Sequence, residues 1–236
     1  MRALFVQQDH VSPTGPIGER FERRGYETVE FPVVPAGRFH APDVEVVFPD
    51  PRDYDVIVPM GAPWSVYDEA TIGSWVRAEL EFLRLAHESG VPVLGICFGG
   101  QALAAALGGR VERGPEPEIG WHTIETRAPG LVEAGPWFQW HHDRWSPPPG
   151  ADALARTAAA PQAFTLRRSL AVQFHPELTL TMLEGWLGNG GGDWVTAHGG
   201  DVERLVAMTE EEEPAAVARA YRLVDRFLDQ VAARPR

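Results

Sequence analysis

Short apolar runs alternate with amphipathic stretches along the first half of the chain. The apolar runs predict strands, and the stretches with apolar residues at helical spacing predict helices. The predicted strands are residues 3–6, 26–31, 55–59 and 91–96, and the predicted helices are residues 17–25, 71–89 and 102–107. This alternation predicts an α/β fold with an open, mostly parallel sheet and helices on both faces.

The pattern changes after about residue 110. Short strands joined by turns are predicted at residues 111–112, 121–126, 153–157 and 170–174. We interpret this region as a β-rich insertion that rejoins the sheet, and we expect helix again near residues 177–187.

Glycine and proline divide the end of the chain. Residues 188–192 read Gly-Asn-Gly-Gly-Gly and predict a linker, so we expect one domain at 1–187 and a C-terminal helical extension at 188–236. A helix is predicted at 214–231, begun by the acidic run 210–213. Its apolar residues follow a 4-3-4-3 spacing, so it either docks on the parent domain or forms an interface with a partner or a second copy.

Composition excludes several kinds of chemistry. All 21 basic residues are arginine, against 33 Asp and Glu, and one cysteine is present. Without lysine there is no Schiff-base lysine and no P-loop lysine, and one cysteine cannot form an intrachain disulfide. The net charge of −12 argues against nucleic-acid and anionic-membrane partners. With no signal peptide and no spanning segment expected, we predict a cytoplasmic protein.

The single cysteine lies where a strand meets a helix. Residues 95–99 read Gly-Ile-Cys-Phe-Gly, with an apolar run before them. A sharp strand-to-helix turn of this G-x-C-x-G form projects the side chain outward, and it requires small neighbours. The helix N-terminus that follows favours a thiolate. We therefore predict that Cys97 is a nucleophile.

A second motif supplies a base. An apolar run ends in His175-Pro176-Glu177, and Pro176 favours an extended conformation at His175. Ligand crevices of open α/β sheets lie at the carboxyl ends of strands, which is where this places His175. Glu177 is placed to orient the imidazole. A third segment, the small-residue loop 60–68, follows a predicted strand and can direct backbone N–H groups at an oxyanion, together with the N–H of Phe98.

In this order, the three motifs resemble those of class-I (triad-type) glutamine amidotransferases. Residues 95–101 are similar to the G-[IV]-C-x-G-x-Q elbow of the family, residues 173–177 to its Q-F-H-P-E segment, and residues 60–65 to its oxyanion loop. Residues 118–121, Glu-Ile-Gly-Trp, resemble a segment found in the subgroup of the GMP synthase amidotransferase domain.

The resemblance implies a flavodoxin-like amidotransferase fold and hydrolysis of the glutamine γ-amide. Cys97 would attack the amide, His175 would transfer the proton and Glu177 would orient His175. The oxyanion would be held by the backbone N–H groups of Ala62 and Phe98. The residues implied to lie at the substrate are Gly61, Gln101, His142 and Asp143. Ammonia would pass to an acceptor, through a synthase partner, with no cofactor.

The chain departs from the family pattern at two positions. Ala62 stands where the second glycine of G-G-P is usual, and His142 stands where S-H-G-D has glycine. A γ-glutamyl peptidase or hydrolase that takes a larger amide is therefore an alternative, and a catalytically silent regulatory or binding subunit is a third. We expect no metal site at 141–143, because adjacent residues of a strand point to opposite faces.

Overall fold

We describe a computed structural model of the chain, which covers residues 1–233 and residue 235. The largest element is an eight-stranded sheet in the order β2-β1-β3-β4-β10-β9-β8-β6. Its parallel half contains β1 (Arg2–Gln7), β2 (Glu27–Pro32), β3 (Val56–Pro59), β4 (Val93–Ile96) and β10 (Ser169–Val172). Its antiparallel half adds β9 (Pro161–Leu166), β8 (Asp152–Arg156) and β6 (Glu125–Thr126).

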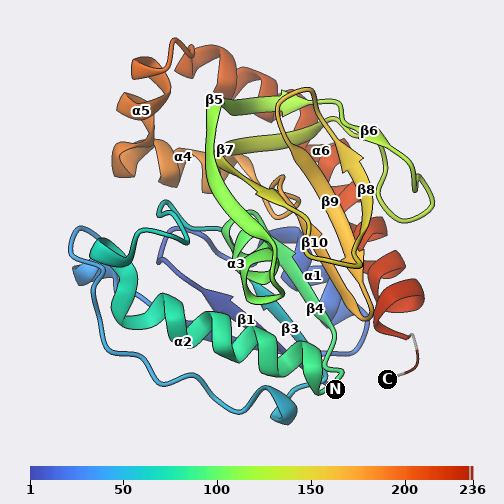
Figure 1. Cartoon of the computed structure of the whole chain (residues 1–236). Helices are drawn as coiled ribbons and strands as arrows, with labels where there is room; N and C mark the ends of the chain where they lie inside the picture. Colours follow the sequence, from blue (N-terminus) through green and yellow to red (C-terminus); the bar gives the residue numbers. More distant parts are fainter. Residues whose placement is uncertain (234, 236) are drawn as a thin grey trace.

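Helices cover both faces of the parallel half (Figure 1). On one face, α2 (Glu69–Glu88) and α3 (Phe98–Ala106) pack against alternate strand residues such as Leu4 and Ile57. On the other face, α1 (Gly15–Arg23) and α6 (Val202–Arg226) pack against the intervening residues, such as Phe5 and Val58. The predicted architecture, a mostly parallel sheet with two helical layers, is confirmed.

A hairpin of two long strands stands above this sheet. β5 (Arg110–His122) pairs antiparallel with β7 (Trp137–Ser146), with an irregularity in the register between Arg113 and Glu118. Residues from the hairpin, from α4 (Leu180–Trp186), from α5 (Gly192–Ala197) and from the start of α6 form a third apolar cluster, which includes Phe138 and Val195. Sequence patterning predicts only short pieces of β5, at residues 111–112 and 121–126, and it does not predict β7.

The glycine-rich residues after 187 are not an extended linker in the structure. Leu187–Gly191 is a kinked helical segment that connects α4 to α5. The division at residue 187 stays a prediction, and the residues on either side of it share one core.

The C-terminal helix is longer than its sequence pattern predicts. It begins at Val202, where the Asp201 carboxylate accepts a hydrogen bond from the Arg204 N–H at 3.0 Å, and Pro214 lies inside it rather than at its start. Of its predicted apolar seam, Val224, Leu228 and Val231 are buried in the main core, and Val217 and Tyr221 are half-buried. The seam therefore docks on its own chain.

Two short helical turns, at Ala36–Arg38 and Pro51–Asp53, lie in the connection between β2 and β3, and the helical segment Phe227–Ala232 follows α6. None of the helices in the part of the chain described here is long and apolar enough to cross a bilayer.

Candidate active site

Cys97 lies in the tight turn between β4 and α3. Its backbone has φ 49° and ψ −108°, and among the described non-glycine residues only Cys97 and Arg167 have a positive φ. Such a conformation costs about 1–3 kcal/mol and persists only where the surroundings enforce it. A Cβ on Gly95 would lie 2.7 Å from the carbonyl oxygen of Gly99, and one on Gly99 would lie 2.1 Å from that of Pro59. The glycines of the motif are therefore required by close backbone approach.

Hydrogen bonds from neighbouring strands hold this turn. The Cys97 N–H donates to the carbonyl of Val172 at 2.8 Å, and the Gly99 N–H donates to the carbonyl of Met60 at 2.9 Å. The ends of β3, β4 and β10 are thus joined at one point. Cys97 is buried, with 4% of its surface exposed.

His175 and Glu177 form a buried pair after β10. The Nδ1 of His175 lies 2.7 Å from Oε1 of Glu177, whose side chain is fully buried. The backbone N–H of His175 donates to the carbonyl of Phe138 on β7, at 2.9 Å. A hydrogen bond to Glu177 places the ring proton on Nδ1 and leaves Nε2 as the basic nitrogen. Among the described residues, Nε2 has no hydrogen-bond partner.

The environment favours a protonated His175. Burial alone lowers the pKa of the imidazole, but the nearby Cys97 and the hydrogen-bonded Glu177 carboxylate outweigh it, and the pKa lies well above 6.5. A thiol that lies close enough to raise this pKa can pass its proton to the ring. The site therefore contains the parts of a cysteine–imidazolium pair.

The loop after β3 lies against this pair. A Cβ on Gly61 would lie 2.9 Å from Cε1 of His175 and 3.8 Å from Cβ of Cys97. Ala62 needs no left-handed backbone, because its φ is not positive, so alanine fits where the family has glycine. The N–H of Phe98 is the first of α3 and has no acceptor within the helix.

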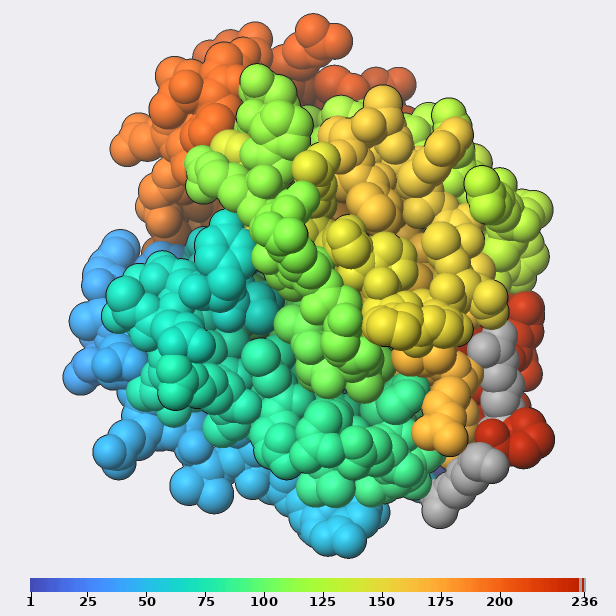
Figure 2. All heavy atoms as spheres, in the orientation of Figure 1, coloured from blue at the N-terminus to red at the C-terminus, as the bar shows by residue number. Residues whose placement is uncertain are grey.

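A cavity of about 520 Å³ opens onto these residues. It brings together all the residues predicted at the site except Phe98 and Glu177, which lie behind its wall. The predicted residues that line it are Gly61, Ala62, Cys97, Gln101, His142, Asp143 and His175. On the outer surface, the orange helical segment that forms one side of the cavity faces the blue and cyan loops (Figure 2).

Two of the predicted substrate contacts are already engaged by protein groups. Nε2 of Gln101 lies 3.3 Å from the carbonyl oxygen of Asp143 and 3.4 Å from Oε1 of Gln173, so this side chain connects α3 to the hairpin. The hydroxyl of Tyr67 donates to Oδ1 of Asp143 at 2.8 Å. His142 is half-buried, and burial lowers its pKa.

A buried polar cluster attaches the hairpin to the sheet beneath the site. The Glu118 carboxylate accepts hydrogen bonds from Oγ1 of Thr157 and Nε2 of Gln162, both at 3.0 Å, and lies 3.2 Å from Nε2 of His141. Burial raises the pKa of Glu118, but His141 and Thr157 lower that pKa by a larger amount. The net shift is downward, so the carboxylate stays charged. This cluster fixes the strand that carries Asp143.

Sequence patterning misses several residues of the cavity wall. The Trp186 ring lies 4.9 Å from that of His175, and its Nε1 donates to the carbonyl of Val11. Trp140, whose aromatic neighbourhood is typical of a core, stacks on Trp194 at 5.9 Å. Nε2 of Gln173 lies 3.6 Å from the Cys97 sulfur. Further wall residues without a sequence signal for this site include Asp9, Phe39, His40, Arg113, Asn189 and Gly191.

Comparison with known proteins places this site in a family. Residues 26–187 match the model of the family "Glutamine amidotransferase class-I", and the chain therefore belongs to that family. The GMP synthase [glutamine-hydrolyzing] of Thermomicrobium roseum is 42% identical over 137 residues, which is 54% of this chain and 24% of that protein. That of Aeropyrum pernix is 35% identical over 184 residues, which is 72% of this chain and 34% of that protein. The chain thus spans about a quarter to a third of these relatives.

Solved structures share the fold. A glutamine amidotransferase from Thermotoga maritima superposes with a TM-score of 0.82 at 22% identity, covering 98% of this chain and 99% of that one. A second glutamine amidotransferase, from Methylobacillus flagellatus, gives a TM-score of 0.84 at 22% identity, covering 100% and 96%. The flavodoxin-like class-I amidotransferase fold expected from the motifs is therefore confirmed.

Proposed function

We propose that this protein hydrolyses the γ-amide of glutamine through a thioester on Cys97, giving glutamate and ammonia for transfer to an acceptor. The observation that carries the proposal is the strained Cys97 turn, which opens into the same cavity as the His175–Glu177 pair. Membership in the class-I amidotransferase family supports amide hydrolysis for ammonia transfer in general.

Nε2 of His175 takes the proton of the Cys97 thiol, and the sulfur attacks the amide carbon. The negative charge that develops on the oxygen is stabilised by the backbone N–H groups of Ala62 and Phe98. When the intermediate collapses, the C–N bond breaks and His175 returns the proton to the nitrogen, so ammonia leaves. Glu177 keeps the imidazole in the tautomer that this exchange needs.

Water completes the cycle. His175 takes a proton from a water molecule while the oxygen of that water attacks the γ-glutamyl thioester. The C–S bond breaks, glutamate leaves, and the proton returns to the Cys97 thiolate. The net reaction consumes one glutamine and one water and needs no cofactor. We further infer that the ammonia is used by a synthase partner, and that the protein works in the cytoplasm, where a free thiol stays reduced.

The direct test is a glutaminase assay with purified protein. We expect equal amounts of glutamate and ammonia from the wild type and no turnover from Cys97→Ala. Undiminished activity in Cys97→Ala would overturn the proposal. A second test, with an electrophile, separates a protein that has no catalytic activity from an enzyme that is inactive only because its partner is missing. Labelling of Cys97 by a glutamine-analogue chloroketone supports the proposal, whereas a Cys97 that stays unlabelled with native lysate present favours a silent subunit.

The size of the cavity favours a second candidate, a γ-glutamyl hydrolase that acts on a larger amide. A volume of about 520 Å³ falls in the range of about 300–1,000 Å³ that houses drug-sized ligands, and four tryptophans line it, Trp64, Trp140, Trp186 and Trp194. The chemistry on Cys97 is the same, with an amine in place of ammonia as the leaving group. Parallel assays of glutamine and γ-glutamyl dipeptides decide between the two, because a glutaminase leaves the dipeptides intact.

A further inference from the structure

Two side chains of opposite charge lie next to each other on the hairpin above the site. Arg113 of β5 and Asp143 of β7 are directly opposite in the antiparallel register. Opposite residues share a face, with Cα atoms about 4.5–5.5 Å apart. Both side chains line the cavity that contains Cys97. Within the part of the chain that the structure describes, no ion pair joins them.

Asp143 is a buried carboxylate without a cation. It is 6% exposed, and its described side-chain hydrogen bond comes from the neutral Tyr67 hydroxyl, which reaches Oδ1. A buried charge is costly unless it is paired, so this carboxylate is suited to accept a positively charged group from a molecule in the cavity.

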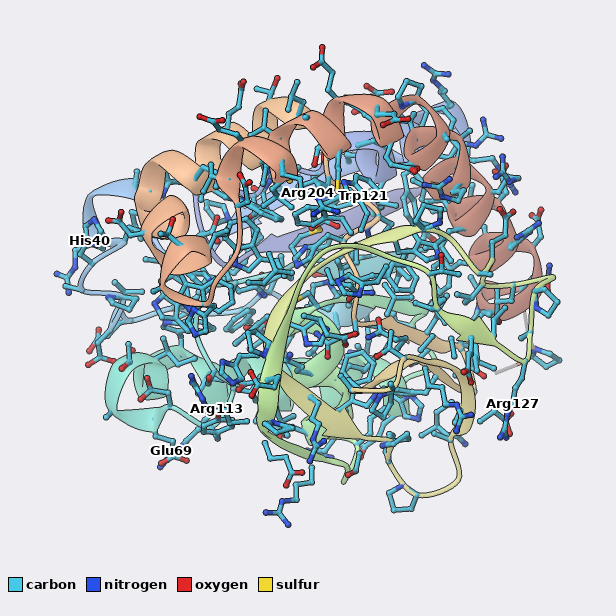
Figure 3. The ribbon with its side chains drawn as sticks, turned by 90° about the horizontal axis from the view of Figure 1, so that it is seen from above. His40, Glu69, Arg113, Trp121, Arg127 and Arg204 are labelled. Carbon is cyan, nitrogen blue, oxygen red and sulfur yellow. The ribbon has the colours of Figure 1, made fainter. Side chains whose placement is uncertain are left out.

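Arg113 presents the complementary charge at the mouth of the cavity. Its side chain is exposed and, among the contacts described, forms no ion pair, whereas Arg20, Arg84 and Arg222 each bind a carboxylate. Figure 3 shows Arg113 leaving the hairpin toward the end of α2 that carries Glu69. A guanidinium offers a planar fork of N–H donors that matches a carboxylate.

We propose that Arg113 and Asp143 together bind the amino-acid end of the substrate, with its α-carboxylate on Arg113 and its α-ammonium on Asp143. An α-amino acid carries these two charges on a single carbon, and the hairpin places the two opposite charges on neighbouring backbone positions. The inference rests on the proposed function and deepens it. The γ-amide, at the far end of the same molecule, is then the group that faces Cys97.

The assignment is tested by combining a variant of each charged side chain with a substrate that lacks the group which that side chain would bind. We expect Arg113→Ala to raise KM for glutamine by about 10- to 100-fold with little change in kcat, because it removes a charge-assisted contact that is equal in ground and transition states. L-Glutaminamide, which lacks the α-carboxylate, loses a similar factor with the wild type and no further factor with Arg113→Ala. Arg113→Lys, which keeps the charge but not the fork, falls between. Asp143→Asn in turn abolishes discrimination between glutamine and N-acetylglutamine.

A matched control comes from Arg127, another exposed arginine, on the far side of the molecule (Figure 3). Arg127→Ala makes the same change in net charge and is expected to leave KM unchanged. Equal effects of Arg113→Ala on glutamine and L-glutaminamide would overturn the inference. The inference would also be overturned if Arg113→Ala impaired only the cleavage of γ-glutamylglycine and not that of γ-glutamylglycinamide. Arg113 would then bind a carboxylate on the leaving group.

Binding measurements keep this inference separate from the reaction. Calorimetric titration of glutamine and L-glutaminamide into Cys97→Ala and into Cys97→Ala/Arg113→Ala needs no turnover. An Arg113-dependent preference for glutamine, with neither hydrolysis by the wild type nor labelling of Cys97 in native lysate, supports the inference and removes the proposed function. Hydrolysis without that preference removes the inference alone, and an absence of binding by both ligands overturns it as well.

Discussion

At the scale of single residues, the site depends on groups that are strained or charged in places where they would not be stable alone. Cys97 keeps a positive φ because backbone hydrogen bonds to the ends of β3 and β10 hold its turn in this conformation. His175 has a raised pKa because Cys97 and Glu177 lie beside it, even though burial opposes the charge. Each unfavourable feature is therefore enforced by a neighbour that the proposed chemistry also needs.

Glu177→Gln tests the electrostatic part of this arrangement. The change keeps the shape and removes a charge that raises the pKa of His175, so we expect that pKa to fall. Activity should drop by about 10²–10⁴-fold, the usual contribution of general acid–base catalysis. Imidazole NMR resonances recorded against pH give the pKa directly.

The same variant has a stability signature. A raised pKa in the folded state means that protonated His175 stabilises the fold fully below the ordinary histidine pKa, and that this stability is lost as pH rises through the folded pKa. In Glu177→Gln that loss should occur at lower pH. Glu184→Gln, at an exposed position of α4, is the control, and an unchanged His175 titration in Glu177→Gln would contradict the argument.

Sequence reasoning reaches the centre of this site but not its walls. Cys97, His175 and Glu177 can be predicted because each carries a local signature, such as flanking glycines or a following proline. Arg113 and Trp186 carry none, since Arg113 reaches the cavity through the register of β5 against β7 and Trp186 through the packing of a distant helix. Gln101 and Asp143 line the cavity and their role at the substrate stays a prediction, whereas their contacts with Gln173 and Tyr67 depend on the fold.

At the scale of elements, predictions succeed where the chain is continuously apolar and fail where it is interrupted. The parallel strands other than β2 are apolar runs, β2 alternates polar and apolar residues in part, and all are found within a few residues of their predicted bounds. β5 contains Gly114, Pro115 and Pro117 at its irregularity, which conceal a strand that continues on both sides. In α6, Pro214 is typical of a first turn and therefore masks the true start, which Asp201 caps.

One helix, α2, carries a buried carboxyl group, Glu79, that makes the stability of the fold depend on pH. Oε1 of Glu79 accepts a hydrogen bond from Nε2 of Gln8 at 2.6 Å, at the end of β1, and the side chain is fully buried. Burial raises the pKa of Glu79 from 4.5 to about 8. Between these values the folded state holds a proton that the unfolded chain releases, so stability falls as pH rises from 4.5 to 8.

Glu79→Gln should remove this dependence. The neutral amide preserves the shape and needs no proton, so the loss between pH 4.5 and 8, on the order of 4 kcal/mol, should disappear from the variant. We expect its melting temperature to exceed that of the wild type at pH 8 and to be close to it at pH 5. Exposed Glu81→Gln is the matched control on the same helix, and parallel pH profiles of the wild type and Glu79→Gln would contradict the prediction.

At the scale of the whole molecule, the end of the chain completes the main core. α6 and the segment Phe227–Ala232 pack in the same apolar cluster as α1 and the sheet. Arg20 and Arg24 of α1 both bind the Asp225 carboxylate, at 2.7 Å and 2.8 Å. The residues after 187 therefore contribute to the stability of those before it.

Phe227→Ala measures that contribution. Phe227 is fully buried in this cluster, so its truncation should lower the free energy of unfolding by about 3–5 kcal/mol. Urea denaturation gives the value, and Glu211→Ala on the exposed face of α6 should change it by less than about 0.5 kcal/mol. A small loss for Phe227→Ala would show that the C-terminal helices fold independently of the sheet.

The cavity draws its walls from segments spread between Asp9 and Trp194. During synthesis, the nucleophile is therefore exposed to the cell long before the residues that enclose it exist. A ribosome-bound chain that stops before Trp186 has the cysteine and its base but lacks the aromatic side of the pocket. The cavity is therefore complete only when most of the chain has emerged.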